Sequence, residues 1–87
     1  MYKYNFETYK LNESQIDSVQ RYAEYHANAQ IYKRGFEGKN IGPKLKKRFS
    51  DKYERNVFLK VLEADLLGIA VTDTERKIYN NIYGEFN

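Results

Sequence analysis

Residues that break helices are confined to a few places in this 87-residue chain, and this confinement most constrains its fold. Three of the five glycines and the single proline fall between residues 35 and 43, and a fourth glycine stands at position 68. The stretches on either side of the first break are long enough for helices of roughly six turns. We therefore expect a mainly helical protein in which residues 35–43 connect two long helices.

Capping signals predict where the helices begin. Asn12, followed three residues later by Gln15, has the spacing of a capping box, in which each side chain bonds the backbone N–H of the other residue. Thr72 and Glu75 repeat this spacing. Proline suits the first position of a helix, where its missing N–H would have no partner, so Pro43 predicts a third start. We expect helices over residues 13–34, 43–67 and 72–83.

Glycines predict where these helices end, because glycine adopts the left-handed conformation of many helix termini at no steric cost. Gly35 follows two basic residues, Lys33 and Arg34, which suit the negative end of a helix dipole. We expect Gly35 to end the first helix and Gly68 to end the second. Ser50 is a candidate N-cap at which the middle helix would be interrupted.

Alternating residues near the N-terminus predict a β-strand. Over residues 2–9, every second side chain is Tyr, Phe or Thr, and the intervening ones are Lys, Asn, Glu or Tyr. A strand needs a partner for its backbone groups, and residues 69–71 are the other stretch with strand character. The expected fold is mainly α with a minor α+β element. It is one compact domain over residues 1–87, with an N-terminal strand, three principal helices and a short second strand at 69–71.

Apolar residues cover most sides of the helix expected over residues 57–67, which predicts that this helix is the central, buried element. We expect Leu62 to belong to its core. The first helix carries an aliphatic stripe of Ile16, Val19, Ala23, Ala27 and Ile31, and a nearly opposite stripe of Tyr22, Tyr25, Ala29 and Tyr32. Two interpretations of the tyrosine stripe stay open. It packs within the protein, against the N-terminal strand, or it contacts a partner.

Positive charge is concentrated in residues 33–55. This segment holds nine Lys or Arg and three acids, a balance of +6, whereas the whole chain has a net charge of +3. The segment also contains Phe36, Phe49 and Tyr53. A basic cluster with aromatic residues is typical of a surface that meets an anionic partner, although many such clusters are only solvated helix faces.

Catalytic and metal-binding classes find little support. His26 is the only histidine, and we expect it to be a partly buried, hydrogen-bonded residue and not a base. Glu63 and Asp65 are two apart on a helix and point in nearly opposite directions, so they cannot hold one ion. The glycines at 35–42 lack the lysine–hydroxyl ending of a phosphate loop. We expect a non-enzymatic protein with no metal and no cofactor.

Nucleic-acid binding is the first functional hypothesis. Lys44, Lys47 and Arg48 recur at three and four positions on the expected helix and can meet phosphates together, while Leu45 and Phe49 would face inward. Nucleic acid, or a complex that handles it, is the expected partner. The expected binding residues are Lys33, Arg34, Phe36, Lys39, Lys44, Lys46, Lys47, Arg48, Lys52 and Arg55, with a secondary interface of Tyr22, Tyr25, Tyr32, Arg76, Asn80 and Asn81.

A protein-binding inhibitor is the alternative. The basic helix and the tyrosine stripe are compatible with docking on an acidic protein or nucleoprotein surface, since Tyr and Arg are enriched at interface hot spots. The abundance of Lys, Asn, Ile, Tyr and Phe indicates an AT-rich coding genome, typical of small phage or mobile-element proteins. Such a protein would block a host enzyme or defence complex, in the manner of an anti-CRISPR, with no nucleic-acid binding of its own.

Two DNA-reading motifs give weaker hypotheses. Residues 64–69 resemble the helix-turn portion of a helix-turn-helix unit, with residues 72–83 as the recognition helix and Arg76, Asn80 and Asn81 as base readers. Four residues between Gly68 and that helix depart from the motif. A strand ahead of a helix also resembles ribbon-helix-helix repressors, but no break follows a short first helix, and Glu7 would face DNA.

Location and assembly are constrained less directly. No apolar run approaches the roughly 18–20 residues of a membrane span, and the first ten residues do not form a signal peptide. The absence of cysteine fits a reducing cytoplasm, that of the host if the protein is phage-encoded. The sequence leaves the oligomeric state open, and a dimer is compatible with it.

Overall fold

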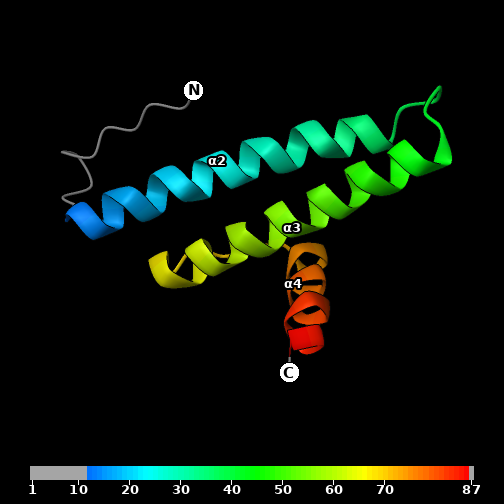
Figure 1. Ribbon diagram of the computed structural model, residues 1–87. Coiled ribbons are helices and arrows are strands. Elements are labelled where there is room, and N and C mark those ends of the chain that lie inside the picture. The colour runs from blue at the N-terminus through cyan, green and yellow to red at the C-terminus, as the bar shows by residue number, and fades with distance from the viewer. Residues whose placement is uncertain (1–11, 87) are drawn as a thin grey trace.

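The computed structural model describes residues 12–86, which form three helices. They are α2 (Glu13–Phe36), α3 (Pro43–Leu67) and α4 (Asp73–Phe86). Figure 1 shows α2 and α3 side by side as an antiparallel hairpin, with α4 crossing α3 on its other side. The prediction of a mainly α protein is confirmed. The predicted strand over residues 2–9 lies outside the described residues.

The link between α3 and α4 contains no strand, so the prediction of a strand at 69–71 is wrong. The N–H groups at the start of this link instead bond to the last carbonyls of α3. Gly68 has a φ of 72°, and the N–H groups of Gly68 and Ile69 donate to the carbonyls of Asp65 (3.4 Å) and Ala64 (2.8 Å). This is the Schellman pattern, in which a left-handed residue lets two N–H groups satisfy the last carbonyls of a helix. Gly68 therefore ends α3 as predicted.

The two predicted capping boxes are both present. The Oδ1 atom of Asn12 accepts from the N–H of Gln15 at 2.8 Å, and the Oε1 atom of Gln15 accepts from the N–H of Asn12 at 3.2 Å. Thr72 and Glu75 bond in the same way at 3.1 and 3.0 Å. Pro43 opens α3, which continues through Ser50 without the predicted interruption.

Gly35 does not end α2, which is a correction to the prediction. The helix continues through this residue to Phe36, and the glycine with positive φ among the described residues is Gly68. A Cβ atom at position 35 would lie 2.7 Å from Cδ2 of Phe49 on α3. Gly35 is therefore a point of close contact between the two long helices, where its missing side chain makes room for the Phe49 ring.

The core is small and lies where α3 meets both other helices. Its fully buried large side chains are Val57 and Val61 on α3, which pack against Ala29 of α2, and Ala64 is buried beside them. Ile78 and Tyr79 of α4 close the cluster from the other side. Because α2 and α4 cover only two sides of α3, the predicted all-round burial of this helix is wrong.

Leu62 lies on the uncovered side and is 36% exposed, so its assignment to the core is also wrong. On α2, the buried residues are Ser18, Ala23 and Ala29, whereas Ile31 of the aliphatic stripe is 62% exposed. Ala29 belongs to the tyrosine stripe, which therefore faces α3. The first of the two interpretations of that stripe is right about packing within the protein, but the packing partner is α3.

Replacing Gly35 by Ala tests the close approach of the helices. We expect the free energy of unfolding to fall by about 1 kcal/mol, because overpacking against Phe49 outweighs the gain in helix propensity. The matched control is Gly84→Ala on α4, where a new Cβ meets nothing within 4 Å and stability should rise by about 0.5–1 kcal/mol. Urea unfolding measures both, and equal effects would contradict the packing role of Gly35.

Replacing Val61 by Ala tests the position of the core. We expect a loss of about 2 kcal/mol, because two methyl groups leave a fully buried site. Leu62→Ala is the adjacent control and should cost less than about 1 kcal/mol. A larger loss from Leu62→Ala than from Val61→Ala in thermal unfolding would place the core on the wrong side of α3.

Candidate functional site

The positive charge of the chain gathers at the closed end of the hairpin formed by α2 and α3. Residues 33–48 contain one acid, Glu37, and seven basic residues, so they carry the whole +6 found over residues 33–55. We call this segment the basic tip. It consists of the last turn of α2, the connecting loop and the first turns of α3 (Figure 1). Its cations are all exposed: Lys33, Arg34, Lys39, Lys44, Lys46, Lys47 and Arg48.

The helix dipoles stabilise the cations of the basic tip that lie on α2 but not those that lie on α3. Lys33 and Arg34 lie in the last turn of α2, where positive charge is stabilised by the carbonyl end of the helix. The basic residues of α3 lie at its N-terminal end, where the dipole is also positive. That end has no acid in its first turn and no side-chain cap on its N–H groups. The start of α3 therefore accumulates positive charge that no acid or side-chain cap in its first turn compensates.

Ion pairing separates the basic tip from the rest of the molecule. Lys47 contacts Asp51 at 3.5 Å in an exposed pair, and the other six tip cations have no acidic partner within residues 12–86. In contrast, three cations elsewhere pair between helices: Arg21 with Glu63, Lys60 with Glu75, and Arg76 with Asp65. Lys52, Arg55 and Lys77 also have no acidic partner among the described residues, and the basic tip is where most of the unpaired cations of residues 12–86 gather.

Aromatic residues lie between the helices beneath the basic tip. Phe36 packs edge-on against Tyr53, with ring centroids 5.3 Å apart, and Tyr32 packs against Phe49 at 6.0 Å. The ammonium of Lys52 lies 5.5 Å from the Tyr32 ring centroid. Phe36, predicted as a binding residue, is therefore half-buried support for the hairpin.

Two further predictions concern side chains of the hairpin, Leu45 at the start of α3 and the tyrosines of α2. Leu45 is 44% exposed and does not face inward as predicted, because the first turns of α3 extend past the packed part of the hairpin. Tyr22 and Tyr25, like Tyr32, are half-buried along the α2 stripe that faces α3.

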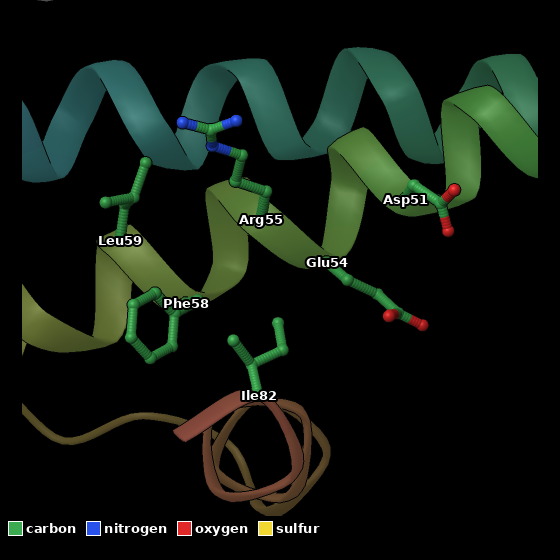
Figure 2. Close-up of a pocket in the computed structure, with 6 residues that line it drawn as sticks. All are labelled: Asp51, Glu54, Arg55, Phe58, Leu59 and Ile82. Carbon is green, nitrogen blue, oxygen red and sulfur yellow. The ribbon is translucent and has the colours of Figure 1, made fainter. Parts of the chain in front are cut away.

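Arg55 is separate from the basic tip. It borders a groove of about 460 Å³ between α3 and the C-terminal half of α4. Figure 2 shows Phe58 of α3 and Ile82 of α4 pointing into the space between the two helices, with the charged side chains further along α3. The groove is lined by Asp51, Glu54, Arg55, Phe58, Leu59 and Ile82.

The predicted base readers of α4 are not equivalent. Both terminal nitrogens of Arg76 donate to the carboxylate of Asp65, at 2.7 and 3.0 Å, and its guanidinium lies 5.4 Å from the Tyr79 ring centroid. The hydrogen bond from Arg76 holds the pKa of Asp65 below its ordinary value. Reading a base with Arg76 would require breaking this pair. Asn80 and Asn81 are exposed.

A buried lysine joins all three helices. Lys60 of α3 is 5% exposed, and its ammonium donates to Nδ1 of His26 on α2 at 2.9 Å and to Oε2 of Glu75 on α4. The Tyr22 ring lies 5.6 Å from the same nitrogen and stacks on His26. We call these four residues the Lys60 cluster. The predicted hydrogen-bonded role of His26 is confirmed, whereas its partner Lys60, and the pairing of Lys60 with Glu75, were not predicted.

Charge states within the Lys60 cluster follow from its geometry. An ammonium can only donate, so Nδ1 of His26 must accept, and the imidazole is neutral. Burial and the adjacent Lys60 lower the pKa of His26 below its ordinary value. Burial raises the pKa of Glu75, but hydrogen bonds from Lys60 and Thr72 outweigh that effect, and the pKa lies below its ordinary value. The cluster is an ion pair capped by a neutral histidine.

The sequence contains one signal that would have found this cluster. Lys60 interrupts the apolar run from Val57 to Leu62, and a single lysine in such a run requires a buried partner or an exposed helix face. Glu63 is a second charged residue of α3 that packs against α2. Its Oε1 atom pairs with Arg21 at 2.9 Å, and its Oε2 atom is buried without a hydrogen-bond partner.

Comparison with other proteins gives no relative. No protein-family model, curated protein or solved structure matches this chain. Within residues 12–86, none of the helices has the length and apolar character needed to cross a membrane. The same part of the chain contains no group of three His, Cys, Asp or Glu side chains that would hold a metal ion.

The charge states of the Lys60 cluster predict a loss of stability in acid. Folded His26 binds fewer protons than unfolded His26, so the free energy of unfolding should fall as the pH drops from about 7 through the lowered pKa. Glu75 adds a further loss below pH 4.5, through its own lowered pKa. Urea midpoints measured between about pH 4 and pH 8 give the profile.

The control for this profile is His26→Gln, whose amide oxygen accepts from Lys60 without titrating. Because His26 is the only histidine, this variant should flatten the profile between about pH 5 and pH 7. If the free energy of unfolding of this variant changed with pH as steeply as that of the wild type, protonation of His26 would not be what destabilises the folded protein.

Proposed function

We propose that the protein is a non-enzymatic binding protein that holds the phosphate backbone of a nucleic acid with its basic tip. The observation that carries the proposal is the set of six exposed cations at the closed end of the hairpin without an acidic partner among the described residues. Neutralising phosphates with lysine and arginine releases condensed counterions, which drives binding largely without regard to sequence. Binding to the phosphate backbone without reading the bases fits the basic tip, because its exposed side chains are mainly cations.

The geometry of α3 supports this mode. Lys44, Lys47 and Arg48 are exposed and spaced by three and four residues, so they are neighbours on one helix and point outward together. The uncapped start of α3 adds the positive end of a helix dipole at the same place. A bound anion would neutralise charge that the fold leaves uncompensated, so binding should also stabilise the hairpin end.

The test is fluorescence anisotropy with generic single- and double-stranded DNA and RNA over a salt series. The wild-type protein should bind with a log–log salt slope of roughly −4 to −5, which corresponds to about five phosphate contacts. The triple variant Lys44→Ala, Lys47→Ala and Arg48→Ala should weaken binding and bring the slope about 2–3 units closer to zero. Each exposed substitution should change the free energy of unfolding by less than about 0.5 kcal/mol.

A charge-matched comparison locates the contact surface. Lys77→Ala removes one exposed cation of α4, far along the chain from the basic tip, and should leave the slope unchanged, whereas Lys44→Ala should reduce it by about one. Equal effects of the two variants would mean that net charge alone is responsible. Absence of binding at low salt would overturn the proposal and make an acidic protein surface the partner to test next.

A further inference from the structure

The first turn of α3 exposes a large apolar side chain in the middle of the basic tip. Leu45 is 44% exposed and stands directly between Lys44 and Lys46 in the chain. No other exposed large apolar residue of the described chain has a cation on both sides; these residues are Ile31, Leu62, Leu66, Ile69 and Tyr83. Single exposed leucines are common on protein surfaces, but an apolar side chain enclosed by unpaired cations restricts what can cover it.

Helix geometry aims Leu45 outward from the closed end of the hairpin. Side chains of an α-helix lean toward its N-terminus, and α3 begins with Pro43 at that closed end (Figure 1). Arg48 follows Leu45 by three residues, so the two side chains are neighbours on the helix surface. An apolar side chain and the cations proposed to hold phosphates therefore approach an external surface together.

The charges around Leu45 indicate the chemistry of the partner. Lys44, Lys46 and Arg48 have no acidic partner among residues 12–86, and an apolar protein surface over Leu45 would take them out of water without compensation. The partner therefore has anions on either side of an apolar slot. A nucleic-acid duplex has this arrangement, because phosphates flank stacked bases roughly 3.4 Å apart. A lipid surface fits less well, since even a myristoyl chain gives only marginal membrane binding.

Building on the proposed function, we infer that Leu45 is a wedge that enters between two base pairs of double-stranded DNA from the minor groove and bends the duplex. Apolar wedges of this kind partly unstack one base step and kink DNA by about 20–90°. The hairpin is roughly 20 Å wide across its two helices, too wide for the roughly 12 Å major groove, so single side chains must make the contact with the bases. DNA is the expected duplex because its pyrimidine–purine steps kink easily.

Fluorescence energy transfer between dyes at the two ends of a DNA duplex of about 25 base pairs with a central TA step measures the bend. Saturating wild-type protein should raise the transfer efficiency, because bending brings the ends together. Leu45→Ala should bind with the wild-type salt slope, since its phosphate contacts are intact, but should leave the efficiency at the value of free DNA. The matched control is Ile31→Ala, which truncates an exposed apolar residue of α2 outside the basic tip and should bend DNA as the wild type does.

A mismatched base pair tests insertion separately from bending. A central mismatch removes part of the cost of unstacking, so the wild type should bind the mismatched duplex about tenfold more tightly than the matched one. Leu45→Ala should bind both duplexes equally. Leu45→Phe keeps an apolar wedge and should retain the preference, whereas Leu45→Gln, similar in size but polar, should lose it. Helical circular dichroism at the wild-type value shows that each variant is folded.

Failure of the wedge is distinguishable from failure of the proposed function. Wild-type protein that binds DNA without bending it, an equal bend by Leu45→Ala, or binding to single strands alone would overturn the wedge and leave phosphate binding intact. A bend of double-stranded RNA but not of DNA, or Leu45-dependent binding to phosphatidylserine vesicles in place of DNA, would also overturn it. Absence of binding to any nucleic acid at low salt would overturn the proposed function, and the wedge with it.

Discussion

The buried ammonium of Lys60 is the interaction on which the arrangement of the three helices depends. A charge that is 5% exposed must be paired, because leaving it without a partner costs several kcal/mol. His26 satisfies it from α2 and Glu75 from α4, so one nitrogen atom links α3 to both of the helices that pack on it. Glu75 also closes the capping box with Thr72, and one carboxylate therefore both begins α4 and holds it to α3.

The small size of the hydrophobic core explains why polar contacts have this role. Val57 and Val61 are the large side chains that are fully buried, and around them the helices meet through alanines, half-buried apolar and aromatic side chains, and interhelical ion pairs. Buried ion pairs contribute little net stability compared with apolar residues of the same size, but they disfavour alternative alignments of two helices. Ion pairs between helices use Arg21, Lys60 and Arg76, whereas six of the seven cations of the basic tip have no acidic partner among residues 12–86.

Much of the local structure was predictable because its causes lie within a few residues. Asn12 and Gln15, Thr72 and Glu75, and the glycine at position 68 specify helix ends through bonds between near neighbours in the chain, and all of them are present. The role of Gly35 was not predictable in this way. Its sequence context is that of a helix terminator, and only the Phe49 ring from α3 shows that space for a neighbour, not a left-handed turn, requires the glycine.

The sequence by itself determined the three helices, their starts, the end of α3 and the segment that carries the positive charge, because hydrogen-bond geometry and charge are local properties. The tertiary structure decided which faces are covered. It buried Lys60, exposed Leu62 and Leu66, and turned the tyrosine stripe toward α3. A helix with apolar residues on most sides does not specify which sides its neighbours will cover, since that choice depends on partners far away in the chain.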